Sequence, residues 1–275
     1  MGKVFLVGAG PGDPELLSLK ASRLIKEADV ILTDNLVFGV KKQIPEGKKI
    51  VDVGKTAERH KLSQDEINRL LVELAVSGKY EKVVRLKGGD PFIFGRGSEE
   101  ALFLKEHGVD FEVVPGISSA VAVPADFGIP LTHRGVSSSV TVVTGHEQEK
   151  EEKEEGEEGK GEEGKGEGGG LDWEAVANLR GTLVILMGAG NLARNVGRLL
   201  KHGMPAETPV AVLERGFTPD ARIVVGELGN IVKLARQARV KPPAVVVVGE
   251  VVKVREKLQK SKSQNLVGSQ NLQEP

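Results

Sequence analysis

Short apolar runs alternate with amphipathic segments along most of this chain of 275 residues. Runs rich in Val and Ile that are bounded by Gly or Pro are typical of strands buried on both faces of a parallel sheet. In the first part of the chain they fall at 4–7, 30–33, 50–53, 83–86 and 111–114. In the second part they fall at 140–144, 183–187, 210–214, 223–225 and 244–248.

Helix signals lie between these runs. Asp13 can cap a helix that has Pro14 at its first position. Ser63 and Glu66 enclose the sequence SQDE, which is a capping box. Apolar periodicity predicts further helices near 99–107, 118–127, 173–179, 193–201 and 231–237.

The alternation predicts an α/β protein made of two α/β domains. The first domain, 1–115, has a parallel sheet. The second, 116–252, has a mixed sheet, because the short connection between its strands at 210–214 and 223–225 favours antiparallel pairing. Residues 147–170 form a flexible insertion that we expect to be dispensable for catalysis, since a run of Glu, Gly and Lys cannot bury apolar surface. Residues 253–275 are expected to be a disordered basic and polar tail.

The net charge of −1 conceals an uneven distribution. Residues 147–170 contain 11 Glu and 4 Lys, a local charge of −7, so the rest of the chain has a charge of +6. The tail at 253–275 holds five Lys or Arg and two Glu, a charge of +3, which leaves about +3 on the folded body, too little to indicate nucleic-acid binding. No apolar stretch is long enough to span a bilayer, and the first ten residues enter a strand rather than a signal peptide. We therefore expect a cytoplasmic protein with no membrane partner.

The absence of cysteine excludes disulfides, thiolate catalysis and Cys-ligated zinc. The five histidines show no paired spacing of the kind that metal sites use. No metal is expected.

Two glycine-rich turns invite comparison with the dinucleotide-binding fingerprint G-x-G-x-x-G. In VGAGPGD, at 7–13, Asp13 stands at the third glycine position and would repel a pyrophosphate. Asp34, however, follows at the distance of a ribose-binding acid, which leaves a nicotinamide-dependent dehydrogenase open. The later LMGAGNLA satisfies G-x-G-x-x-A through Gly188 and Gly190. A tight turn, or contact with a nucleoside that has no phosphate, would explain that pattern equally well.

A third group of candidates follows the predicted strands. Because the loops after parallel strands gather at one edge of the sheet, these segments can converge on one ligand. The group comprises Asp34, Lys55, His60, the loop 88–90, the sequence PGISSA at 115–120 and the sequence PLTHR at 130–134. Each member has a structural alternative as a turn, a helix cap or a solvated side chain. PGISSA lacks the G-x-S-x-G elbow, which disfavours a serine hydrolase.

The segment VRLKGGDPFIFGRGSEE, at 84–100, is the most informative part of the chain. Gly88 and Gly89 permit close approach of the backbone to a ligand, and Asp90 places a carboxylate beside them. The loop also combines cations with a flat apolar stretch, namely Arg85, Lys87, Arg96 and residues 92–94. This composition suits a ligand with an anionic rim and a flat apolar part.

Several segments together resemble the tetrapyrrole methylase family over residues 3–252, apart from the acidic insertion. They are VGAGPGDPELLSLKA, GKTAERHKLSQDEIN, VVRLKGGDPFIFGRGSEE, VPGISSAVAVPADFGIPLTHR and TLVILMGAGNL. The strings GGDPFIFGRG and GIPLTHR are highly specific, whereas VGAGPGD is shared across the wider family. The GK…H…Q.EIN string is similar to that of the uroporphyrinogen branch.

The resemblance implies a homodimer of two-domain subunits with S-adenosylmethionine bound in a cleft between the domains and a small-molecule tetrapyrrole beside it. It implies methylation of carbons on two adjacent pyrrole rings of uroporphyrinogen III. Asp34 corresponds to the family's proton acceptor and Lys55 to its proton donor. The cofactor would contact Pro11, Gly88, Gly89, Asp90, Ile93, Ser118, Ser119, Met187 and Gly216. For the substrate carboxylates we expect Arg85, Lys87, Arg96, His133 and Arg134.

One departure from the family pattern bears on the acid. Thr33-Asp34-Asn35 stands where many relatives have Tyr-Asp-Arg, so a cation expected beside Asp34 is missing from this segment. Within the family, a later precorrin methylase is an alternative. Outside it, the alternatives are the dehydrogenase and a non-catalytic nucleoside-binding module.

Overall fold

The computed structural model describes residues 1–37, 39–54, 62–146 and 170–258. They form two compact units. The first contains Met1–Phe127 together with Arg215–Arg222, and the second contains Gly128–Glu214 and the chain from Ile223 onward. Residues 116–127 thus belong to the first unit, whereas the sequence pattern had assigned them to the second domain.

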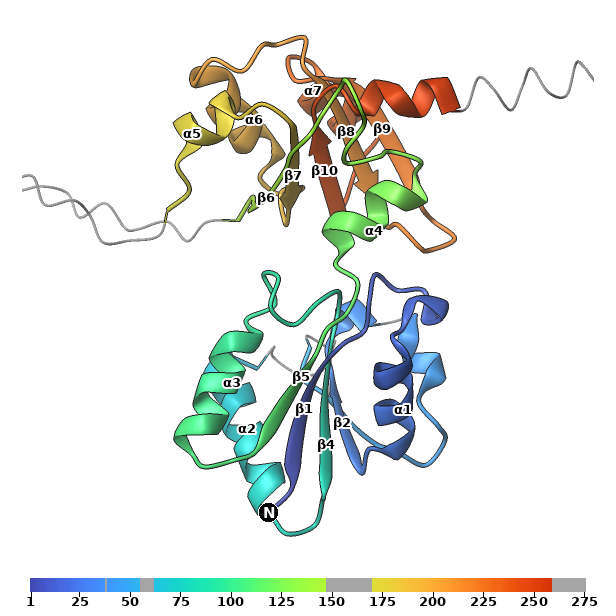
Figure 1. Cartoon of the computed structure of the whole chain (residues 1–275), viewed down its shortest axis with the longest axis vertical. Coiled ribbons are helices and arrows are strands. Elements are labelled where there is room, and N and C mark those ends of the chain that lie inside the picture. The colour runs from blue at the N-terminus through green and yellow to red at the C-terminus, as the bar shows by residue number, and fades with distance from the viewer. Residues whose placement is uncertain (38, 55–61, 147–169, 259–275) are drawn as a thin grey trace, which may run out of the picture. The chain divides into compact units, whose positions relative to one another are not determined.

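The first unit is built on a parallel sheet of five strands (Figure 1). The strands are β1 (Lys3–Gly8), β2 (Val30–Thr33), β3 (Lys49–Asp52), β4 (Lys82–Lys87) and β5 (Phe111–Val114). Their order in the sheet is β3-β2-β4-β1-β5, and every neighbouring pair is parallel. This arrangement confirms the predicted parallel sheet and brings all five carboxyl ends to one edge.

Helices cover both faces of this sheet. On one face α1 (Leu19–Glu27) packs with η2 (Asn35–Val37) and η3 (Val40–Gln43) in one apolar core. On the other face α2 (Gln64–Val76) and α3 (Gly97–Glu106) pack in a second core (Figure 1). Two core layers explain why β1 and β2 have apolar residues at successive positions rather than at alternate ones.

The first predicted helix is interrupted. Asp13 caps only the short helix η1 (Pro14–Leu16), because Leu17 takes an extended conformation. Ser18 then caps α1 by accepting a hydrogen bond from the Ala21 amide at 3.1 Å. The sequence showed the first cap and missed the second.

The second unit contains a mixed sheet of five strands in the order β6-β7-β10-β8-β9. The strands are β6 (Val140–Thr144), β7 (Thr182–Leu186), β8 (Pro209–Glu214), β9 (Arg222–Glu227) and β10 (Ala244–Val248). β6 pairs with β7 in parallel, whereas β10 pairs with β7 and β8 antiparallel. The predicted mixed sheet is confirmed.

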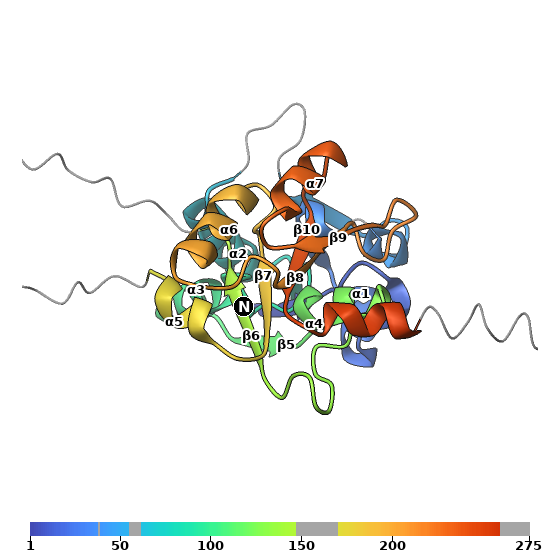
Figure 2. The ribbon, with the colours of Figure 1, turned by 90° about the horizontal axis from the view of Figure 1, so that it is seen from above.

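Three helices of the second unit pack into one apolar core. They are α5 (Trp173–Asn178), α6 (Leu192–Lys201) and α7 (Ile231–Gln237). Trp173 and Leu199 bury their side chains against strand residues such as Ile185. Figures 1 and 2 both show α5 and α6 side by side. The last helix of the first unit, α4 (Ser119–Asp126), follows β5.

The end of the described chain differs from expectation. The tail was predicted to be disordered from Lys253, but residues 252–258 are helical. Val252 and Val254 are buried, so this segment is packed rather than extended into solvent. Residues 259–275 and the insertion at 147–169 lie outside the described residues. No helix in the described ranges is long and apolar enough to cross a membrane.

The capping box at the start of α2 gives the first testable prediction. Ser63 Oγ accepts from the Glu66 amide at 3.2 Å, and the Glu66 carboxylate accepts from the Ser63 amide at 2.7 Å. Replacing Ser63 by Ala should lower the free energy of unfolding by about 1 kcal/mol in urea titrations. Ser98→Ala, at an exposed serine that caps no helix, serves as the control. Equal stability of the two variants would contradict the assigned cap.

Candidate functional site

The carboxyl edge of the first sheet joins the loops that follow β1 and β4. Gly10 N donates to Gly89 O at 3.1 Å, and Gly89 N donates to Gly10 O at 2.8 Å. The Ala9 amide donates to Lys87 O at 2.7 Å. These bonds extend the pairing of two adjacent strands into their loops, so Pro11 and the predicted loop 88–90 lie close together.

Glycine is required where these loops meet the loop after β5. A Cβ on Gly8 would lie 2.5 Å from Gly116 N and 2.7 Å from Gly89 O. A Cβ on Gly116 would collide with the same Gly89 oxygen. Since these are contacts with backbone atoms, no rotamer change can relieve them. Three strand ends therefore approach more closely than any side chain would permit.

Asp90 fastens the same junction. One carboxylate oxygen accepts from the Phe92 amide at 2.8 Å, and the other accepts from the Gly116 amide at 3.0 Å. Ser118 is buried and caps α4 by accepting from the Ala120 amide at 3.2 Å. Asp90 and Ser118 thus have structural roles at an edge where both were also predicted to bind a cofactor.

Apolar side chains extend from the loop after Asp90 into solvent. Phe92 is 55% exposed, and Ile93 and Phe94 are nearly as open. Phe94 and Arg96 adopt left-handed backbone angles, with φ of 51° and 56°. Such angles strain residues that have a side chain, and they cluster at ligand sites.

Asp34 lies at the end of β2 and is held from two sides. Its Oδ1 accepts from the Leu36 amide at 3.0 Å, and its Oδ2 lies 3.5 Å from Arg85 Nη2. The first contact is the turn predicted as the structural alternative for this residue. The second supplies, from β4, the cation that Asn35 does not provide.

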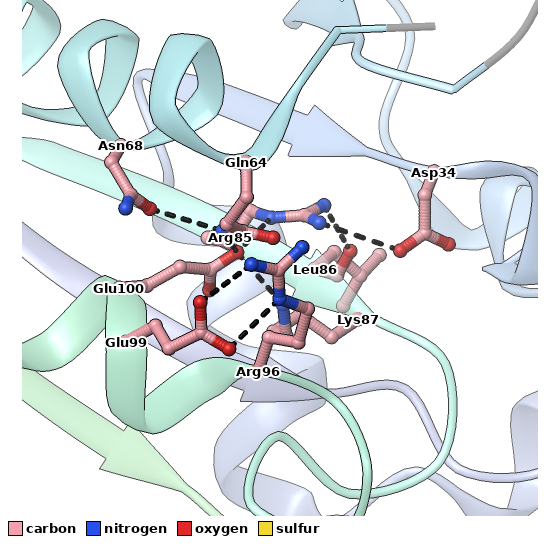
Figure 3. A network of polar contacts seen from close by, with 9 residues as sticks. All are labelled: Asp34, Gln64, Asn68, Arg85, Leu86, Lys87, Arg96, Glu99 and Glu100. Carbon is pink, nitrogen blue, oxygen red and sulfur yellow. Dashed lines mark hydrogen bonds and ion pairs between the residues drawn. The ribbon is translucent and has the colours of Figure 1, made fainter. Parts of the chain in front are cut away.

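Arg85 and Lys87 are buried rather than open to a substrate. Each is 4% exposed, and both pair with Glu100 of α3, as Figure 3 shows. Burial, with the nearby Arg85 charge, holds the pKa of the Lys87 ammonium below its usual value, and Glu100 opposes that shift. Direct contact with a substrate carboxylate, as predicted for Arg85 and Lys87, does not fit this geometry.

Arg96 remains at the surface. It pairs with Glu99 through two short contacts of 2.8 and 2.6 Å (Figure 3). The hydrogen bond to Glu99 raises the pKa of the Arg96 guanidinium, so it stays charged throughout the accessible range. It is the one predicted substrate cation of the first unit that is exposed in the described structure.

The second unit holds three further predicted residues. His133 and Arg134 are exposed on a tight turn, in which the His133 and Ser137 backbones exchange hydrogen bonds of 3.0 and 2.9 Å. Met187 follows β7 with a left-handed φ of 55°, and its side chain is 51% exposed.

Gly216 belongs to the loop at 215–221, before β9, and this loop groups with the first unit. A Cβ there would come within 2.8 Å of Val123 on α4, so glycine permits close packing on that helix. The flanking Arg215 and Phe217 have left-handed φ of 52° and 61°. Phe217 N donates to Asp126 at 3.0 Å, which fastens the loop to α4.

Two predicted residues of the third group, Lys55 and His60, lie outside the described residues. Ser119 is half-buried beside Gly89, since its amide lies 3.7 Å from where a Cβ on that glycine would stand. Among the residues described, no group of His, Cys, Asp or Glu could hold a metal ion.

Sequence reasoning missed Glu100 and its neighbour Gln64. Glu100 occupies a buried position of α3 together with Gly97, Ala101 and Leu104. These positions have the spacing of a buried helical stripe. A carboxylate on such a stripe needs a buried partner, so the position of Glu100 in the sequence could have indicated that a buried cation lies against it.

Comparisons with known proteins agree with one another. The family model for tetrapyrrole (corrin/porphyrin) methylases matches residues 3–232. An S-adenosyl-L-methionine-dependent uroporphyrinogen III methyltransferase from Methanosarcina barkeri is 52% identical over 91% of this chain and 92% of its own length. A uroporphyrinogen-III C-methyltransferase from Methanocaldococcus jannaschii is 48% identical over 92% of this chain and 98% of its own.

A solved structure is similar as well. The crystal structure of the uroporphyrin-III C-methyl transferase from Thermus thermophilus, complexed with S-adenyl homocysteine, aligns with a TM-score of 0.74 and 43% sequence identity. The alignment covers 92% of this chain and all of that chain.

The glycine junction yields a second prediction. Gly8→Ala should lower the free energy of unfolding by about 1–3 kcal/mol, because its Cβ would push against two fixed backbones. The control is Gly197→Ala inside α6, where a Cβ meets nothing within 4 Å. Alanine there should be neutral or stabilising by up to about 1 kcal/mol. Chemical denaturation of both variants measures the difference, and equal stabilities would refute the steric account.

Proposed function

This chain belongs to the tetrapyrrole (corrin/porphyrin) methylases, and we propose that it methylates uroporphyrinogen III with S-adenosylmethionine as the methyl donor. The products would be a monomethylated intermediate and then precorrin-2, methylated on two adjacent pyrrole rings, for sirohaem or cobalamin synthesis. The observation that supports this most strongly is 52% identity, over 91% of the chain, to a methyltransferase named for that substrate and donor.

The chemistry of the first sheet's edge fits such a donor. Bound S-adenosylmethionine supplies an electrophilic sulfonium methyl group. A zwitterionic nucleoside without phosphates needs backbone polar groups, one acid and apolar surface, and Gly88, Gly89 and Ile93 offer backbone and apolar groups at this edge. Asp90 supplies the acid. The turn after β1 is poorly suited to a pyrophosphate, because Asp13 caps η1 at the position a phosphate would take.

We propose the individual donor contacts by resemblance to the family. In the first unit they are Pro11, Gly88, Gly89, Asp90, Ile93, Ser118, Ser119 and Gly216. For Met187, which lies in the second unit, we likewise propose a contact with the donor. Its exposed thioether and left-handed backbone favour contact with a ligand over a purely structural turn.

Asp34 is the proposed proton acceptor. An electron-rich pyrrole carbon attacks the methyl group, after which the ring system carries positive charge and must lose a proton. The Asp34 carboxylate can stabilise that charge and accept the proton. Lys55 is the proposed proton donor.

The substrate's carboxylates call for exposed cations. Arg96, His133 and Arg134 are exposed and can serve, the arginines through paired N–H groups. Arg85 and Lys87 are buried, so we reassign them to the support of Asp34. The alternatives are a later precorrin methylase and a dehydrogenase. The identities of 52% and 48% to uroporphyrinogen III methyltransferases favour uroporphyrinogen III as the substrate over both alternatives.

Two further features are proposed by resemblance to the family. The active form is a homodimer, and the protein works in the cytoplasm. Analytical ultracentrifugation would test the first of these directly.

The reaction can be tested by anaerobic incubation of the protein with uroporphyrinogen III and S-adenosylmethionine. Mass spectrometry should show a gain of two methyl groups. Asp34→Ala should lower kcat by about 100-fold, as expected when a proton acceptor is lost, while S-adenosylhomocysteine still binds. Tight binding of the nucleoside with no methyl transfer would contradict the proposed substrate.

Asp90 gives a separate binding prediction. Asp90→Asn keeps one acceptor oxygen but loses the second, so it cannot accept from both Phe92 and Gly116. We expect S-adenosylhomocysteine affinity, measured by calorimetry, to fall by about 10-fold or more, because the loop loses the carboxylate proposed to face the ligand, and a charged hydrogen bond is worth about 1.5–3 kcal/mol. Asp110→Asn, at an exposed carboxylate just before β5, should leave the affinity unchanged.

A further inference from the structure

Two cations of β4 lie buried behind the carboxyl edge of the first sheet. Arg85 and Lys87 occupy alternate positions on the strand, so their side chains leave the same face. Each is 4% exposed. Removing two positive charges from water is costly unless each finds acceptors in the interior. The fold must therefore place an anion on that face.

Glu100 of α3 is that anion. It is fully buried, and its Oε1 accepts from Arg85 Nε at 3.2 Å and from Lys87 Nζ at 2.8 Å. Gln64 Nε2 donates to the same oxygen at 3.2 Å, and the same nitrogen donates to Asn68 Oδ1 at 3.0 Å (Figure 3). Donors from β4 and α2 thus converge on one carboxylate oxygen and fix the side chain of Glu100.

The guanidinium of Arg85 is held at several points. Nε faces Glu100, Nη1 donates to Leu86 O at 3.2 Å, and Nη2 lies 3.5 Å from Asp34 Oδ2 (Figure 3). Because a guanidinium is planar, rotating it toward one acceptor weakens its contact with another. The contact of Nε with Glu100 therefore sets the direction in which Nη2 points toward Asp34.

Asp34 contacts this guanidinium through only one carboxylate oxygen, Oδ2. Its other oxygen is occupied by the Leu36 amide at 3.0 Å, and its side chain is 27% exposed. A carboxylate bound on both sides and partly open has one preferred orientation. Such preorganisation is what a proton acceptor needs, since a small misplacement can cost about 100-fold in rate.

We propose that Glu100 is a positioning residue for the methylation, because it fixes Arg85 so that the guanidinium holds Asp34 in its reactive orientation. The proposal rests on the proposed function, in which Asp34 accepts the proton. Glu100 touches neither substrate nor donor in this scheme and acts only through Arg85.

The charge balance of the cluster dictates which variant can test it. Two cations and two carboxylates compensate one another, so Glu100→Gln alone would leave a surplus buried positive charge and destabilise the unit. The double variant Lys87→Met, Glu100→Gln removes one charge of each sign and keeps side-chain volume. This double variant loses the carboxylate that pairs with Arg85, while the positive and negative charges of the cluster remain equal in number.

The test is a double-mutant cycle between this double variant and Asp34→Ala, with kcat for uroporphyrinogen III methylation as the readout. In the native background the double variant should lower kcat by about 10-fold or more, while the KM for S-adenosylmethionine changes by less than about 2-fold. In the Asp34→Ala background its effect should shrink to within about 2-fold, because nothing remains to be positioned. Glu106→Gln, which removes an exposed carboxylate from the same helix, should change neither rate.

The alternatives give different patterns. An equal fall in kcat in both backgrounds, or no fall in either, would overturn the positioning role of Glu100. Full activity of Asp34→Ala alone would overturn the proposed role of Asp34, and the positioning proposal with it, so the two failures are distinguishable.

Arg85→Lys provides a second cycle that does not depend on the folding of the double variant. Lysine keeps the charge beside Glu100 but lacks the planar fork that reaches Asp34. Its loss of kcat should be about 10-fold and should likewise vanish when Asp34 is replaced by Ala. Additive losses in this cycle would also contradict the proposal.

Discussion

The close approach of three glycine backbones is the constraint on which the first unit depends. Gly8, Gly89 and Gly116 bring the ends of β1, β4 and β5 within contact distances that exclude any Cβ at Gly8 or Gly116. Asp90 then ties the loop after β4 to Gly116. Because three loops are fixed to one another by main-chain atoms, the polar groups at this edge have defined positions before any ligand arrives.

A buried cluster of charged side chains from β4 and α3 lies behind the same edge of the sheet. Arg85, Lys87 and Glu100 are out of water, and their mutual contacts offset the cost of burial without making the cluster a strong source of stability. A cluster of this kind is better understood as a source of orientation. Arg85 reaches from the interior to Asp34, so the partly exposed acid is coupled to a rigid foundation in β4 and α3.

Much of the fold could be predicted from the chain, since apolar runs and caps such as Ser63 depend on local sequence. The site was predictable only in part. The GGD loop and Asp34 follow strands, and parallel topology brings such loops together. Arg85 and Lys87 were predicted to face the substrate, and their burial was not foreseen because burial is a tertiary property. In sequence they resemble surface cations, and only the packing of α3 shows that Glu100 lies against them.

We propose that the carboxyl edge of the first sheet provides most of the contacts to the nucleoside of the methyl donor, and that Gly188 and Gly190 do not form a dinucleotide-type site. A crystal structure of this protein with S-adenosylhomocysteine tests it most directly. We expect density for the nucleoside against Gly88–Asp90 and Ser118–Ser119, with Asp34 open toward the sulfur. Density confined to the turn at Gly188 and Gly190, away from those loops, would contradict it.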